Sequence, residues 1–138
     1  MSEKLSVVPK YYPVNKDYIS RLEGIVFVPE SLKLFWVEHG TSFFNRDEND
    51  ELVNEDALNV MLSPDEIIDI LENADEDDLE TYKRGLPFFE RYDLCYFLIT
   101  AAGQVINEYN GKVTVIADSI DDFVSKLTED SSFYEALL

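Results

Sequence analysis

The stretch that decides the fold is Ile25-Val26-Phe27-Val28-Pro29-Glu30-Ser31-Leu32-Lys33-Leu34-Phe35-Trp36-Val37-Glu38-His39-Gly40-Thr41-Ser42-Phe43-Phe44-Asn45. Pro29 fits the first turn of a helix, because its missing N–H would be unpaired there in any case. Glu30 suits the positive end of the helix dipole. Gly40 closes the helix, since glycine takes the left-handed conformation without steric cost. The stretch therefore predicts a helix that ends at Gly40, followed by a short strand.

The two faces of this helix carry different side chains. At helical spacing, one face holds Leu32, Phe35, Trp36 and His39, and the other holds Leu34 and Val37. A helix that is apolar almost all round is buried or shows its second face to a partner. We therefore expect one face in the core and treat Leu34 and Val37 as candidate partner contacts if they are uncovered.

The chain has 138 residues, which predicts a single domain over residues 1–138, with residues 1–13 as an N-terminal arm. Its net charge of −18 argues against nucleic acid and anionic membrane as partners, and favours a basic protein or simple solubility. The N-terminus lacks the apolar core of a signal peptide, and no apolar run is long enough to span a membrane. These features predict a cytoplasmic protein.

Most of the charge imbalance lies between Asp47 and Glu80, where fifteen acidic residues occur without a lysine or arginine. The simpler interpretation is that these acidic residues form a solvated surface that binds no partner. The functional interpretation is a surface that steers a basic protein into contact, with exposed aromatic side chains as anchors. The predicted partner-contacting residues are Asp47, Glu48, Asp50, Glu51, Asp75, Glu76, Asp77 and Asp78.

The rest of the first half predicts two more helices and a strand. Residues 14–24 have helical periodicity, and residues 58–62 alternate as a strand does. Ser63-Pro64-Asp65-Glu66 is a capping box that begins a helix ending near Asn73. Residues 73–84 are interpreted as a loop or a loose helix.

The second half predicts strands at residues 86–90, 93–100, 104–109 and 113–117, the last two joined by the Asn110-Gly111 hairpin signal. Cys95, the only cysteine, excludes an intrachain disulfide and a cysteine-based zinc site, and its apolar surroundings predict burial. Ser119 or Asp118 caps a further helix, and a last short helix spans residues 132–138. Because tight turns join successive strands, the fold class is α+β, with a mainly antiparallel sheet and a C-terminal meander packed against helices.

Several motifs resemble, in order, the signature of the SMI1/KNR4 (SUKH) superfamily. The matching segments are Gly24-Ile25, Val28-Pro29, Leu34-Phe35, Gly40, Pro87-Phe88, Asp93-Leu94 and the run from Ala117 to Phe123. The family favours Asn-Gly-Gly where this chain has His39-Gly40-Thr41, and glycine where it has Tyr92. The likeness covers residues 14–127.

The resemblance implies an SMI1/KNR4-like domain and, for bacterial members, an immunity protein that binds and neutralises a toxin domain. Toxins that attack nucleic acid have basic substrate clefts, which an acidic inhibitor could occlude. The alternative is a non-enzymatic intracellular scaffold or regulator, as the fungal members are. The oligomeric state stays open.

Catalytic and ligand-binding motifs are weak. His39 is the only histidine, and the sequence indicates no convergent partner for it, so a structural role is expected. Residues 47–58 lack the glycine and glutamate that a calcium loop needs at its sixth and twelfth positions. The glycines are scattered and form no phosphate-binding loop. We therefore expect no enzymatic activity, no cofactor and no metal.

Overall fold

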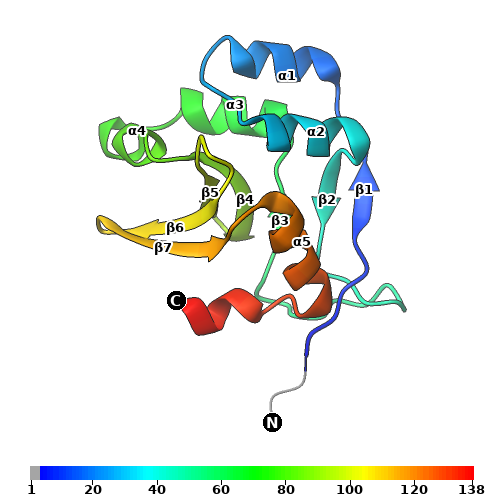
Figure 1. Cartoon of the computed structure of the whole chain (residues 1–138). Helices are drawn as coiled ribbons and strands as arrows, with labels where there is room; N and C mark the ends of the chain where they lie inside the picture. The colour runs from blue at the N-terminus through cyan, green and yellow to red at the C-terminus, as the bar shows by residue number, and fades with distance from the viewer. Residues whose placement is uncertain (1–3) are drawn as a thin grey trace.

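A seven-stranded antiparallel sheet forms the frame of the protein in the computed structural model, which describes residues 4–138 (Figure 1). Each strand pairs with the next one in the chain, so the sheet is a continuous meander. The strands are β1 (Lys10–Tyr12), β2 (Thr41–Phe43), β3 (Val60–Met61), β4 (Leu86–Tyr92), β5 (Cys95–Ile99), β6 (Val105–Tyr109) and β7 (Lys112–Ala117). The expected α+β fold with an antiparallel sheet is confirmed.

The helices lie in separate places around this sheet. They are α1 (Lys16–Glu23), α2 (Glu30–Glu38), α3 (Pro64–Glu72), α4 (Glu76–Tyr82), α5 (Ile120–Glu129) and a 3-10 helix, η1 (Phe133–Leu137). In Figure 1, α1, α2 and α3 gather at the top, α4 lies at the left above the β6–β7 hairpin, and η1 runs beside that hairpin.

Helix α2 buries the predicted face. Leu32, Phe35 and Trp36 are buried, whereas Leu34 and Val37 are 50% and 54% exposed. The indole Nε1 of Trp36 donates a 3.0 Å hydrogen bond to the carbonyl oxygen of Leu62, which ties α2 to the segment before α3. The second face of α2 is thus open to solvent.

Individual residues determine where several helices and strands begin or end. Gly40 follows α2 with a φ of +89°, as expected for a left-handed helix end. Ser63 and Glu66 form the predicted capping box of α3. Asn110 and Gly111 both have positive φ, 50° and 84°, which is the geometry of a type I′ hairpin turn.

The core is rich in aromatic side chains. The rings of Phe89 and Phe123 meet edge to face with centroids 4.9 Å apart, and Phe97 lies 5.1 Å from Tyr134 in the same geometry. All four side chains are buried. Helix α5 and η1 are therefore held on the sheet by aromatic packing.

Some expectations for single elements are wrong. Lys10–Tyr12, expected in an irregular arm, form an edge strand that pairs with β2, and Val7 is buried; residues 1–3 of that arm lie outside the described residues. The expected strand at 58–62 is confined to Val60–Met61. Of the two alternatives for residues 73–84, a loop or a loose helix, the structure shows a helix, α4. Cys95 is exposed rather than buried, because it begins β5 directly after the turn at Leu94.

Candidate functional site

The eight acidic residues expected to contact a partner lie in two separate groups. Asp47, Glu48, Asp50 and Glu51 belong to the β2–β3 connection, whereas Asp75 to Asp78 begin α4. In Figure 1 the β2–β3 connection extends at the lower right and α4 lies at the upper left. The two groups therefore form no single acidic surface.

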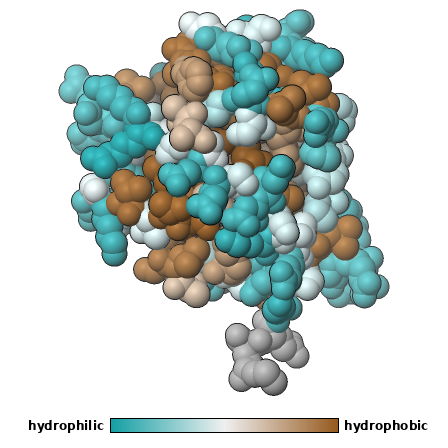
Figure 2. Space-filling view, in the orientation of Figure 1, coloured by the Kyte–Doolittle hydropathy of each residue, from teal (hydrophilic) through white to brown (hydrophobic). Residues whose placement is uncertain are grey.

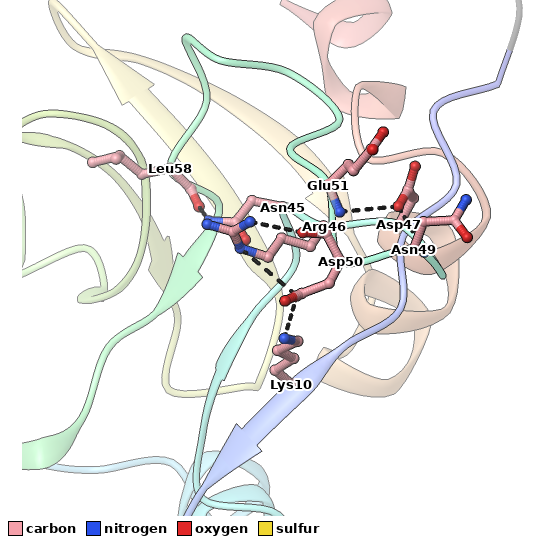
Figure 3. Close-up of polar contacts among 8 residues, drawn as sticks. All are labelled: Lys10, Asn45, Arg46, Asp47, Asn49, Asp50, Glu51 and Leu58. Atoms are coloured by element: carbon pink, nitrogen blue, oxygen red, sulfur yellow. Dashed lines mark hydrogen bonds and ion pairs between the residues drawn. The ribbon is translucent and has the colours of Figure 1, made fainter.

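Two carboxylates of the β2–β3 group hold their own loop together (Figure 3). Asp47 accepts hydrogen bonds from the backbone N–H groups of Asn49 (2.8 Å) and Glu51 (3.1 Å). Asp50 pairs with Lys10 of β1, and its carbonyl oxygen accepts a 2.8 Å bond from Arg46. The hydrogen bond from Lys10 lowers the pKa of Asp50 from its ordinary value.

The remaining members of that group, Glu48 and Glu51, are exposed and form no ion pair with any residue from 4 to 138. Of these four predicted contacts, two therefore present free carboxylates, and the other two, Asp47 and Asp50, hold the loop's structure.

The α4 group has more free charge. Asp75 caps the helix by accepting a 2.8 Å hydrogen bond from the backbone N–H of Asp78. Glu76, Asp77 and Asp78 are exposed, and no ion pair involving them occurs in the described part of the chain. These three acids sit in the first turn of α4, where the helix dipole stabilises negative charge.

An apolar pocket of about 450 Å³ lies beside α4. We call it the α4 pocket; it is lined by Val26, Phe27, Pro29, Leu71, Leu79, Tyr82, Lys83, Arg84, Gly85, Leu86, Ile99 and Ala101. Its walls thus come from the α1–α2 connection, α3, α4 and the ends of β4 and β5. Figure 2 shows hydrophilic atoms over α4 at the left, beside apolar atoms over the α1–α2 connection.

Large apolar side chains are uncovered at this pocket. Phe27 is 69% exposed and Leu79 is 44% exposed. Glu76 lies one helical turn before Leu79, and Tyr82 one turn after it, so all three share a face of α4. Exposed apolar side chains rimmed by charge are typical of protein interaction surfaces. The α4 pocket therefore offers an apolar anchor site, and the free carboxylates lie in the first turn of the helix that forms one of its walls.

Tyr82, Lys83 and Arg84 supply the polar groups of the α4 pocket. Burial, with a contribution from Asp78, raises the pKa of Tyr82 to about 12, so its hydroxyl stays protonated at neutral pH. Lys83 pairs with Glu80 at 2.8 Å. Arg84 is exposed at the rim and forms no ion pair within the described residues. An incoming group thus meets one phenol hydroxyl, one paired lysine and one free arginine.

His39 lies away from this pocket, between the rings of Tyr11 (centroids 5.0 Å apart) and Phe35 (4.9 Å). It also borders a hollow of about 180 Å³ that contains Ser31 and Ser119. Among the described residues it makes no hydrogen bond to either hydroxyl, and the Ser119 hydroxyl accepts the N–H of Asp122 at the start of α5. The geometry shows aromatic packing of His39 and no nucleophile–base pair.

Neither a metal-binding cluster nor a membrane-spanning helix occurs within residues 4–138. No group of three or more His, Cys, Asp or Glu side chains is placed to hold a metal ion there. None of the helices in that range has the length and apolar character needed to cross a membrane.

Comparisons with known proteins give no relative: no family model, no curated protein and no solved structure matches the chain. The likeness to the SMI1/KNR4 superfamily therefore stays a prediction from sequence motifs.

Proposed function

We propose that this protein is a cytoplasmic immunity protein. It binds a basic protein partner, a toxin domain, and neutralises it. The observation that carries the proposal is the α4 pocket, which exposes Phe27 and Leu79, together with the free carboxylates of Glu76, Asp77 and Asp78 in the first turn of the helix that carries Leu79. Apolar anchors supply the binding energy of an interface, and the surrounding charge selects the partner and speeds its approach.

The charge of the whole chain supports a basic partner. A net charge of −18 repels nucleic acid and anionic lipid but attracts a cationic protein surface. A toxin domain that acts on nucleic acid has such a surface at its substrate cleft. Carboxylates on α4 would compete with phosphate for that cleft, so binding alone, without catalysis, would inhibit the toxin.

The sequence motifs support the immunity role within this class. Val28-Pro29, Gly40 and Pro87-Phe88 follow the order of the SMI1/KNR4 signature, whose bacterial members include immunity proteins. Under this proposal the protein is a stoichiometric inhibitor that needs no cofactor. A scaffold that serves several partners is the competing outcome of the test below.

Affinity capture followed by neutralisation tests the proposal. The immobilised protein is exposed to lysate of its own organism at low salt, and bound proteins are eluted with a salt gradient and identified. We expect one basic polypeptide to elute last and to lose its toxic activity at an equimolar amount of this protein. Several unrelated regulatory proteins would instead indicate a scaffold, and a captured protein that stays fully active would contradict the immunity role.

Two matched substitutions locate the contact. Leu79→Glu places a charge in the α4 pocket, and Leu34→Glu places one on the open face of α2, at a helical position of similar exposure. We expect Leu79→Glu to abolish neutralisation and Leu34→Glu to retain it. The reverse pattern would move the interface from the α4 pocket to α2.

A further inference from the structure

A second pocket, of about 270 Å³, lies between the inner face of the sheet and the end of the chain described here. We call it the Arg91 pocket; its lining residues are Arg91, Asn107, Tyr109, Lys112, Thr114 and Leu138. Figure 1 shows the C-terminal segment lying beside the β6–β7 hairpin that forms one wall. Although the chain has 29 acidic residues, none of those within residues 4–138 lines this pocket.

Arg91 enters the pocket because of a β-bulge. Glu90 pairs with Tyr96 and Tyr92 pairs with Cys95, so Arg91 is an extra residue on β4 without a partner on β5. A bulge of this kind redirects a side chain and is common next to binding sites. The register of the strands thus places the guanidinium of Arg91 where an ordinary strand residue would not lie.

Aromatic rings hold that guanidinium in place. Its central carbon lies 4.9 Å from the centroid of Phe97, 5.5 Å from Tyr92 and 5.8 Å from Tyr134. The Nε atom is buried and has no hydrogen-bond partner among the described residues. A cation packed on rings, with its N–H groups underused, is preorganised to bind an anion.

The other polar side chains of the pocket are also donors. Asn107 and Thr114 lie directly opposite each other on β6 and β7, and Lys112 follows two residues away on β7. Neither Arg91 nor Lys112 forms an ion pair within residues 4–138, and Glu135 on η1 accepts a 3.3 Å hydrogen bond from Tyr92 instead. Two unpaired cations, an amide and a hydroxyl therefore converge on one hollow.

The structure assigns to this pocket a binding site for a small oxyanion, a carboxylate or phosphate group. The guanidinium of Arg91 would bind two oxygens in its fork geometry, Lys112 would add a point charge, and Asn107 and Thr114 would orient the anion through hydrogen bonds. The volume suits a small metabolite and not a macromolecule. This site is independent of the α4 pocket and of the proposed partner.

Nuclear magnetic resonance titration of the whole protein tests the assignment. Inorganic phosphate and succinate are added separately at a constant ionic strength of about 150 mM, set with sodium chloride. We expect saturable shifts at Arg91, Asn107 and Thr114 with at least one of the two anions. Saturation by phosphate alone identifies a phosphate site, and saturation by succinate alone a carboxylate site. Absence of saturation with both, or shifts located elsewhere, would overturn the assignment.

Two lysine substitutions, one in the pocket and one far from it, test the same assignment. Lys112→Gln leaves the packing of Arg91 intact and should weaken anion binding about tenfold, the loss expected for one charge-assisted hydrogen bond. Lys16→Gln, at another exposed lysine that forms no ion pair within residues 4–138, removes the same charge far from the pocket and should leave the affinity unchanged. Equal dissociation constants for the two variants would show that the anion does not bind at Lys112.

Discussion

The side chain of Trp36 and the backbone of Leu62 are joined by a 3.0 Å hydrogen bond inside the core. This contact links α2 to the segment that leads into α3, across 26 residues of sequence. Both residues are almost fully buried. The hydrogen bond therefore fixes α2 against the start of α3 inside the core, so it bears on the stability of the protein.

Replacement of Trp36 tests this role. Trp36→Ala should lower the free energy of unfolding by about 3–5 kcal/mol, because it leaves a cavity where a large ring was packed. Trp36→Phe keeps most of the ring volume but leaves the Leu62 carbonyl without this donor, so a loss of about 1–3 kcal/mol is expected. Urea denaturation measures both values. A Trp36→Ala variant as stable as the wild type would show that the indole is not a core residue.

Gly40 should be far less tolerant of substitution than Gly111. Both have positive φ, so alanine is strained by roughly 1–2 kcal/mol at either position. At Gly40 a Cβ would also lie 1.9 Å from the carbonyl oxygen of Tyr12, whereas at Gly111 it would meet nothing within 4 Å. Thermal unfolding should therefore show a larger loss for Gly40→Ala than for Gly111→Ala. Equal losses would contradict the close approach of β1 to Gly40.

Alkaline pH should destabilise the protein through the partly buried Tyr82 and the buried Tyr134. Burial raises the pKa of Tyr82 to about 12 and also raises that of Tyr134, while the ordinary value is 10.0. Above pH 10 the unfolded chain loses these protons first, so stability is complete below pH 10 and falls as pH rises towards 12.

Urea midpoints on either side of pH 10 measure this loss, and absorbance at 295 nm follows tyrosine ionisation in the folded state. Tyr82→Phe should reduce the pH dependence, because it removes a group whose pKa is raised by burial. The same slope in the Tyr82→Phe variant and the wild type would contradict the burial of the Tyr82 hydroxyl.

The elements predicted well from the sequence are those specified by neighbouring residues. The Ser63–Glu66 capping box, the Asn110-Gly111 turn and the helix that ends at Gly40 each depend on contacts within a few positions. Their local chemistry agrees with the final fold, so the α+β class follows from their order.

The elements that were missed depend on distant contacts. The strand Lys10–Tyr12 exists because it pairs with Thr41–Phe43, about thirty residues later in the chain. An apolar run cannot reveal that Cys95 begins a strand beside an exposed turn. Whether Cys95 is buried depends on where the β4–β5 hairpin lies in the sheet.

The same limit applies to the candidate site. The sequence identified the acidic residues but not their division between the β2–β3 loop and α4, which the meander of the sheet separates. The α4 pocket also escaped prediction, because its walls come from four parts of the chain. The one local signal was Leu79 and Tyr82, spaced one turn apart in an otherwise acidic segment.

The central claim, that the carboxylates beside the α4 pocket guide a basic partner, is tested most directly by association kinetics with the captured polypeptide. Rate constants are measured over a range of salt concentrations for the wild type, for Glu76→Gln/Asp77→Asn/Asp78→Asn, and for Glu48→Gln/Glu51→Gln. The α4 variant should associate about tenfold more slowly at low salt and with a flatter salt dependence, because electrostatic steering acts on the association rate. The loop variant should match the wild type. An unchanged rate in the α4 variant would contradict the claim.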